Sequence, residues 1–267
     1  MVAVSRTKSV KVGARRLRTW KKFLTWLDTH SDSSWVFRGL GDSDFQLLPG
    51  IGRGDYSLVK ERSLLEVFER RSAEFVDLSR MTQWDRMALA QHHGLPTRLL
   101  DWTTNPLVAA YFAVTGRRKT VLVKLAGSRK KPFEAVPSAS HVAARIVAFR
   151  VRSADIINQS SEDDPLSSED DPFERKTVGF VLPKSVATRI VNQGGIFSSH
   201  PQPNVPWTSP LDAKEHIFDI PADMRTYFQR RLFYLGVDAQ RIMSGLDGLG
   251  SRLAWQYEAG IGLGAVR

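Results

Sequence analysis

Residues 91–115, QHHGLPTRLLDWTTNPLVAAYFAVT, interleave polar and apolar residues more tightly than a plain helix or strand does. The Leu-Leu-Asp-Trp part is expected to anchor the segment in the core. Thr104 or Asn105 as N-cap, with Pro106 in the first turn, predicts the start of a helix. Such a start presents backbone N–H groups at the positive end of the helix dipole, so it is a candidate anion site.

Arg98 lies shortly before this predicted helix start. Its guanidinium would add a planar fork of donors that suits a phosphate. The alternative is an ion pair with Asp101, three residues further on, which would brace the turn instead. Both interpretations fit the sequence.

Helical patterns dominate the first hundred residues, and strand patterns follow. Apolar periodicity predicts helices over 18–30, 58–78 and 82–93 and a later one over 225–236, while segments rich in Val, Ile and Phe predict strands at 34–38, 120–126, 144–151, 177–183 and 215–221. The strand at 34–38 would end at Arg38. This order predicts an α+β fold with N-terminal helices packed on a mixed or antiparallel sheet.

The formal charge of +10 is unevenly distributed along the chain. Residues 160–174 carry seven acids and no base, so the rest stands at +17, and the first 27 residues hold eight Lys/Arg and no acid. A basic surface of this size favours a polyanionic partner, either nucleic acid or a phosphate-bearing small molecule, although a solvated basic coat is the alternative. Residues 1–17 are interpreted as a basic arm, and 160–174 as a mobile insertion.

Several classes of protein and site are disfavoured by composition. The chain has no cysteine, which excludes disulfides and thiolate chemistry and fits a cytoplasmic setting. No apolar run approaches the roughly 20 residues that a membrane-spanning helix needs. His92 and His93 are adjacent and lack a third ligand at metal spacing, so no metal site is expected. Ser198 and His200 lack the nucleophile elbow that a hydrolase would have.

Two motifs resemble those of a known family. Phe-Arg-Gly at 37–39, together with 91–113, is similar to the FRG domain family, and NQGGIFSSH at 192–200 resembles its later Gln-Gly-x-Phe element. The resemblance covers roughly residues 18–250 and leaves 251–267 as a C-terminal tail.

The order of these motifs also resembles, more distantly, ADP-ribosyltransferases of the Arg-Ser-Glu type. That resemblance implies NAD as cofactor and a role as a toxin or phage-defence effector. The catalytic residues that it implies are Arg38, Thr104 and Glu258, and the implied cofactor contacts are Arg38, Gln91, His92, Arg98, Thr103, Asn105 and Gln193. A histidine that closes the turn by bonding a backbone carbonyl is the alternative role for His92.

The chemistry of NAD is compatible with these residues. Arg38 and the helix start at 104–106 could hold the pyrophosphate by charge-assisted hydrogen bonds. Loss of nicotinamide develops oxocarbenium character, which a carboxylate can stabilise. Two alternatives stay open: a nucleic-acid-binding module, and a protein-interaction module whose acidic insertion covers the basic face.

Overall fold

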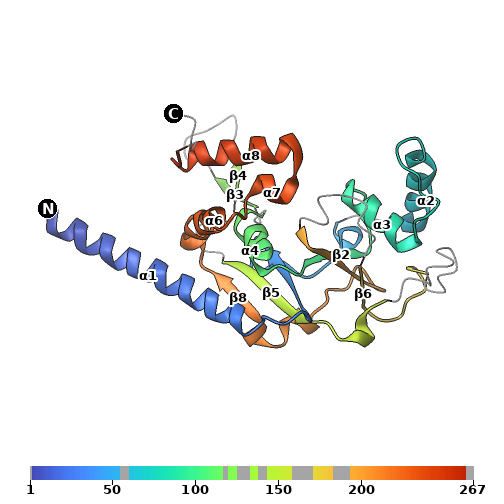
Figure 1. The fold of residues 1–267 in the computed structure, drawn as a ribbon, viewed down its shortest axis with the longest axis horizontal. Coiled ribbons are helices and arrows are strands. Elements are labelled where there is room, and N and C mark those ends of the chain that lie inside the picture. Colours follow the sequence, from blue (N-terminus) through green and yellow to red (C-terminus); the bar gives the residue numbers. More distant parts are fainter. Residues whose placement is uncertain are drawn as a thin grey trace. The chain divides into compact units, whose positions relative to one another are not determined.

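A computed structural model of the chain describes residues 2–54, 60–116, 120–124, 133–137, 143–157, 171–182 and 193–262 (Figure 1). The fold is α+β, as predicted, and every strand pair whose register is defined is antiparallel. The chain forms two compact units. The first comprises Met1–Phe45, Pro106–Ala148 and Ala213–Arg267, and the second comprises Gln46–Asn105 and Phe149–Asp212.

The first unit contains three strands in the order β1 (Trp35–Leu40), β5 (Ala144–Arg150) and β8 (Ile217–Ile220). β5 and β8 are antiparallel, with Ile146 opposite Phe218. A separate two-stranded sheet joins β3 (Thr120–Lys124) to β4 (Phe133–Pro137). β1 continues two residues beyond the predicted end, so Arg38 lies inside the strand rather than at its end.

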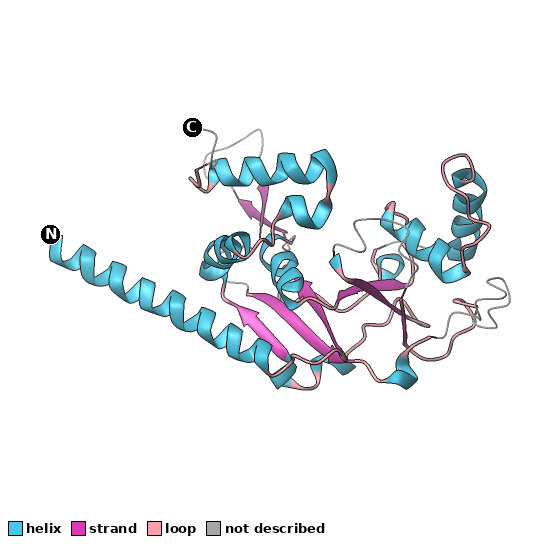
Figure 2. Ribbon diagram, in the orientation of Figure 1, coloured by secondary structure: helices cyan, strands magenta, loops and turns pink. Residues whose placement is uncertain are grey.

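The helices of the first unit are α1 (Val2–Asp28), α4 (Pro106–Thr115), α6 (Arg225–Tyr234), α7 (Ala239–Met243) and α8 (Gly245–Glu258), all drawn in Figure 2. The expected arm at 1–17 is therefore helical from Val2 onwards. Short 3-10 turns lie at Lys214–His216 and Ala222–Met224. None of the described helices of the chain combines the length and apolar character needed to cross a membrane.

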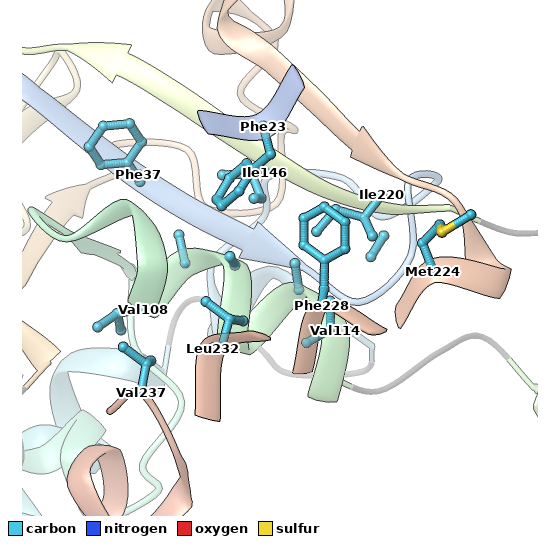
Figure 3. Packing of buried hydrophobic residues seen from close by; sticks show 14 of the residues in the cluster. Phe23, Phe37, Val108, Val114, Ile146, Ile220, Met224, Phe228, Leu232 and Val237 are labelled. Atoms are coloured by element: carbon cyan, nitrogen blue, oxygen red, sulfur yellow. The ribbon is translucent and has the colours of Figure 1, made fainter. Parts of the chain in front are cut away.

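The core of the first unit is apolar and rich in aromatic rings (Figure 3). Phe23 of α1 and Phe37 of β1 are buried together with Ile146 of β5. The ring centroid of Phe228, on α6, lies 5.0 Å from that of Trp20 in an edge-to-face arrangement and 5.4 Å from that of Phe23. The second half of α1 brings Trp20 and Phe23 into this cluster, and this buried aromatic pair fixes how the helix is rotated.

The contact between β1 and α4 depends on small residues. Helix α4 buries Ala109, Ala110 and Ala113, which leave room for a close backbone approach. A Cβ at Gly39 would lie 2.0 Å from the Ala109 carbonyl oxygen and 2.6 Å from the Ala113 nitrogen. Glycine at this position is therefore a packing requirement, and it is not the start of a turn.

The second unit contains α2 (Glu61–Ser72) and α3 (Gln83–His92) and three strands in the order β6 (Gly179–Val181), β7 (Gly195–Ser199) and β2 (Leu99–Thr103). Short 3-10 turns lie at Gly50–Gly52, Ser153–Asp155 and Ser209–Leu211. β7 is the middle strand and pairs antiparallel with both neighbours, so Phe197 lies opposite Asp101 on one side and Val181 on the other.

Helix α3 begins where the sequence predicts, because its N-terminus has a complete capping box. The Thr82 hydroxyl accepts the Asp85 N–H at 3.1 Å, and the Asp85 carboxylate accepts the Thr82 N–H at 3.0 Å. The helix ends before Gly94, whose φ of 91° is the left-handed conformation that glycine adopts readily. The local core beneath it includes Trp84, Met87 and Leu99.

The acidic segment is described only at its C-terminal end. Residues 160–170 of the expected insertion lie outside the described residues. Asp171 accepts a hydrogen bond from Arg62 at 2.8 Å and caps the Phe173 N–H at the same distance. The Phe173 ring lies 4.4 Å from the Arg62 guanidinium. The C-terminal end of this segment is therefore docked on α2, and the mobility of the insertion stays a prediction.

Candidate functional site

Two of the motifs predicted from the sequence meet at one corner of the second unit. The antiparallel register places Thr103, the last residue of β2, opposite Gly195, the first residue of β7. The Thr103 hydroxyl donates to the Gln193 carbonyl at 2.5 Å and accepts the Asn105 N–H at 3.0 Å. We call Thr103, Thr104, Asn105, Gln193 and Gly194 the polar corner.

Gly194 joins the two segments of the polar corner. Its φ is 55°, and its carbonyl accepts the Thr104 N–H at 3.0 Å. A Cβ at this position would lie 2.7 Å from the Thr104 hydroxyl, so a side chain would crowd that group. Thr104 and Asn105 are exposed, whereas Thr103 is buried. The corner therefore presents the Thr104 hydroxyl and the Asn105 side chain to solvent, while Thr103 braces the strand ends.

Arg98 has a buried partner in the second unit. Its guanidinium donates to the Glu61 carboxylate at 2.8 and 3.1 Å, and its backbone N–H donates to the same carboxylate at 2.7 Å. A further bond reaches the Pro172 carbonyl at 3.2 Å, and the Phe173 ring lies 4.5 Å from the guanidinium. Glu61, rather than Asp101, holds the arginine, and this occupied, buried geometry points to a structural role.

Gln91 lies in the last turn of α3, and both the nitrogen and the oxygen of its side-chain amide are hydrogen-bonded. Its nitrogen donates to the Asp101 carboxylate at 2.8 Å, and its oxygen accepts the Thr97 hydroxyl. The rings of His92 and His93 lie 5.1 Å apart with perpendicular planes. Among the described residues, no three His, Asp or Glu side chains cluster as metal ligands. The contacts of Gln91 fit a residue that positions β2.

The second unit also supplies a cation that the sequence did not single out. Arg53 is exposed and donates from Nε to the Leu48 carbonyl at 2.8 Å. Desolvation lowers the pKa of the Arg53 guanidinium, and the negative charge of Asp101 opposes that effect. An arginine remains cationic at neutral pH, so it adds positive charge beside the outward-facing carboxylate of β2.

Arg38 belongs to the first unit and lies between two residues whose positions are fixed. Phe37 is buried in the apolar core, and Gly39 lies against the backbone of α4. The Arg38 side chain itself is half-buried. Its direction from β1 is therefore set by the packing of both neighbours.

Glu258 is the last residue of α8 in the first unit, and its side chain is exposed. At that position a carboxylate lies at the negative end of the helix dipole, which offers it no stabilisation. Within the part of the chain that the structure describes, no hydrogen bond or ion pair orients Glu258, and its catalytic role stays a prediction.

Ser198 and His200 belong to a buried hydrogen-bond network in the second unit. The Trp102 indole N–H donates to the Ser198 hydroxyl at 2.9 Å, and that hydroxyl lies 2.8 Å from Nε2 of His200. The Trp207 ring packs edge-to-face beside this network, with its centroid 5.3 Å from that of the His200 ring. Because Ser198 and His200 are both buried, this pair braces the sheet.

Comparison with known proteins agrees with this arrangement of motifs. Residues 33–121 match the model of the FRG domain. The chain carries an FRG domain. Within that match the FRG domain includes β1 with Arg38 and the whole run from α2 to α4. The matched residues end well before β7, so the pairing that adds Gln193 to the polar corner comes from the structure. No curated protein and no solved structure matches the chain.

Proposed function

We propose that the FRG domain binds NAD through the polar corner and that the protein is an ADP-ribosyltransferase-like, NAD-consuming enzyme. One observation carries the proposal: two segments about 90 residues apart, at Thr103–Asn105 and Gln193–Gly194, are hydrogen-bonded into one corner. The first segment resembles the Ser/Thr cluster of the transferase pattern, and the second resembles the later Gln-Gly-x-Phe element of the FRG family. The proposal places the protein in the cytoplasm as a toxin or phage-defence effector, consistent with a chain that lacks cysteine.

The proposed site offers hydrogen-bond donors to a dinucleotide. The Thr104 hydroxyl and the Asn105 amide are exposed, and the first backbone N–H groups of α4 follow directly in the chain. Donors at a helix N-terminus suit a phosphate. Arg38 is the second predicted contact, because a guanidinium can bind a phosphate through two parallel hydrogen bonds.

The proposed reaction breaks the bond between nicotinamide and ribose C1′. The bonding electron pair leaves with nicotinamide, and the ribose carbon gains oxocarbenium character. An acceptor then attacks C1′ and loses its proton, or water attacks and yields free ADP-ribose. A carboxylate beside the cation would lower the barrier, and Glu258 is the residue proposed for this role.

Binding is tested first. Thermal melting with saturating NAD should raise the melting temperature of the wild type. Arg38→Ala should abolish the shift, and Thr104→Val, which removes one hydroxyl without changing the shape, should reduce it. Arg150→Ala, at the end of β5, and Thr226→Val, on α6, are matched controls that should keep the wild-type shift. A wild-type melting temperature that NAD leaves unchanged would overturn the proposal.

Catalysis is tested separately. Purified protein incubated with NAD and candidate acceptors should release nicotinamide and add the mass of one ADP-ribose to the acceptor. Glu258→Gln should retain the NAD-dependent melting shift and lose nicotinamide release. If Glu258→Gln is as active as the wild type, the glutamate assignment is wrong. If the wild type binds NAD but releases no nicotinamide, the protein is a binding module.

A further inference from the structure

Helix α1 carries a dense group of exposed cations in its second half. Five of the eight residues between Arg15 and Lys22 are lysine or arginine, and all five side chains are exposed. Trp20 is buried in the core of the first unit, which fixes the rotation of the helix. Arg15, Arg18 and Lys22, at spacings of three and four, therefore share the face opposite Trp20.

Helix α6 extends this group of charges. Arg230 and Arg231 are exposed, and the Arg231 guanidinium lies 5.3 Å from the Trp20 ring centroid. A second contact runs from α1 to α6, where the Arg16 guanidinium lies 5.9 Å from the centroid of the Tyr227 ring. The two helices lie beside each other in Figure 1. We name Arg15, Arg18 and Lys22, with Lys21 at their edge, the cationic face. Arg16, Arg230 and Arg231 lie toward the Trp20 side of the helix and add positive charge around it.

Among the described residues, few acidic side chains lie near the cationic face to neutralise its charge. Asp223 binds Arg15 at 2.6 Å, in a pair that is about half exposed on both sides. Asp28 follows only at the C-terminal end of α1. Asp219, on β8, is bound by Arg145 at 2.7 Å. The cationic face therefore keeps an excess of positive charge. Binding of a polyanion would reduce the electrostatic repulsion among these cations.

We propose that the cationic face binds the sugar-phosphate backbone of a nucleic acid duplex. The stretch of α1 from Arg15 to Lys22 rises about 10 Å, roughly the length of three base pairs at 3.4 Å each. An anionic membrane is the less suitable partner, because a membrane-surface helix needs an outward apolar face with aromatic anchors. Here the aromatic residues Trp20 and Phe23 are buried in the core. The proposal does not depend on NAD binding.

The test uses the full chain and a fluorescein-labelled 20-base-pair DNA duplex, with binding followed by anisotropy between 50 and 300 mM salt. The patch variant is Arg18→Gln/Lys21→Gln/Lys22→Gln, which alters only exposed side chains and retains good helix formers. Each lost phosphate contact should cost about eightfold in affinity at 0.1 M salt and lower the salt slope by about 0.9. We expect a loss of about two orders of magnitude or more and a slope smaller by nearly three.

The matched control is Lys60→Gln/Arg71→Gln/Arg80→Gln, which removes the same charge from exposed positions of the second unit. This control should lose much less affinity than the patch variant and keep the wild-type slope. Equal losses in the two variants would overturn the proposal, because they would reflect net charge alone. A wild type that does not bind the duplex at 50 mM salt would also overturn it, as would retention only on phosphatidylserine vesicles. A double-stranded RNA of equal length distinguishes the two kinds of duplex.

Discussion

Both units bury apolar clusters, but among the described residues the second unit buries more polar and charged side chains than the first. The core of the first unit is a cluster of aromatic and aliphatic groups such as Phe23, Phe228 and Leu232. The interior of the second unit adds charged and hydrogen-bonded groups, above all Arg98 with Glu61. Apolar packing tolerates changes that conserve volume, whereas a buried polar pair has no equivalent substitute. We therefore expect the first unit to accept variation in its core and the second to depend on particular residues.

The largest effect is expected at the buried ion pair. Glu61→Gln conserves the shape of the side chain but leaves the guanidinium of Arg98 without its counter-charge. The free energy of unfolding should fall by about 3–5 kcal/mol, measured by urea denaturation. Arg62→Ala is the control next to it in sequence, because its pair with Asp171 is partly exposed and should contribute under about 1 kcal/mol. Equal losses in the two variants would contradict the expected dependence on burial.

The second prediction tests tolerance in the first unit. Leu232 is fully buried on α6, so Leu232→Ala should cost about 3 kcal/mol through the cavity that it leaves. Leu232→Met should cost less than about 1.5 kcal/mol, because it keeps most of the volume. The same urea titrations measure both variants. If Leu232→Met were as costly as Glu61→Gln, the contrast between the two interiors would be lost.

A smaller effect is expected in the network of the second unit. Ser198→Ala removes the hydroxyl that accepts the Trp102 N–H and leaves that buried donor unsatisfied. The expected loss of stability is about 1–3 kcal/mol. Ser63→Ala, at an exposed position on α2, should be close to neutral. A neutral Ser198→Ala would mean that the network adds little to the stability of the sheet.

The smallest effect concerns pH and the first unit. Nε2 of the buried His30 lies 3.0 Å from Nδ1 of His216. Burial lowers the pKa of His30 below 6.5, the charge of His216 lowers it further, and a hydrogen bond to the Trp26 carbonyl and the charge of Asp32 oppose the shift. The unfolded chain therefore binds a proton at higher pH than the folded chain does. The stabilisation is complete above pH 6.5 and is lost as the pH falls toward the folded-state pKa.

Urea midpoints at pH 7.5 and 5.5 measure this dependence. The charge of Asp32 also acts on His30, and Lys214 and Glu215 directly precede His216 in the chain. His216→Asn removes the second imidazole and should reduce the drop in midpoint between the two pH values. An unchanged drop would show that the histidine pair does not carry the dependence.

Local sequence signals predicted some elements well. The capping box at Thr82 and the left-handed Gly236 mark the boundaries of α3 and α6, and both helices lie where they were expected. The first 17 residues contain Gly13 and lack a clear apolar stripe, so the helix there was missed. The packing requirement at Gly39 could not be predicted, because it arises from α4, about 70 residues later in the chain.

The sequence predicted which residues belong to the candidate site better than it predicted which residues they contact. The motif at Thr103–Asn105 and the element at Gln193 were both singled out from sequence, and the structure brings them together through the pairing of β2 with β7. Glu61 could not be predicted as the partner of Arg98, because 37 residues separate them and no local periodicity links the two. Long-range pairing of this kind is decided by tertiary packing.

The close packing of Gly39 against the backbone of α4 has a consequence for substitutions at the neighbouring Arg38. Even a single methyl group at that position would force the strand and the helix apart, and the preceding phenylalanine is equally confined. Replacing the side chain at position 38 should therefore leave the main chain of β1 where it is. Arg38 could be replaced by lysine, glutamine or a non-natural cation without moving the backbone. Differences in behaviour among such variants would then report the chemistry of that one side chain.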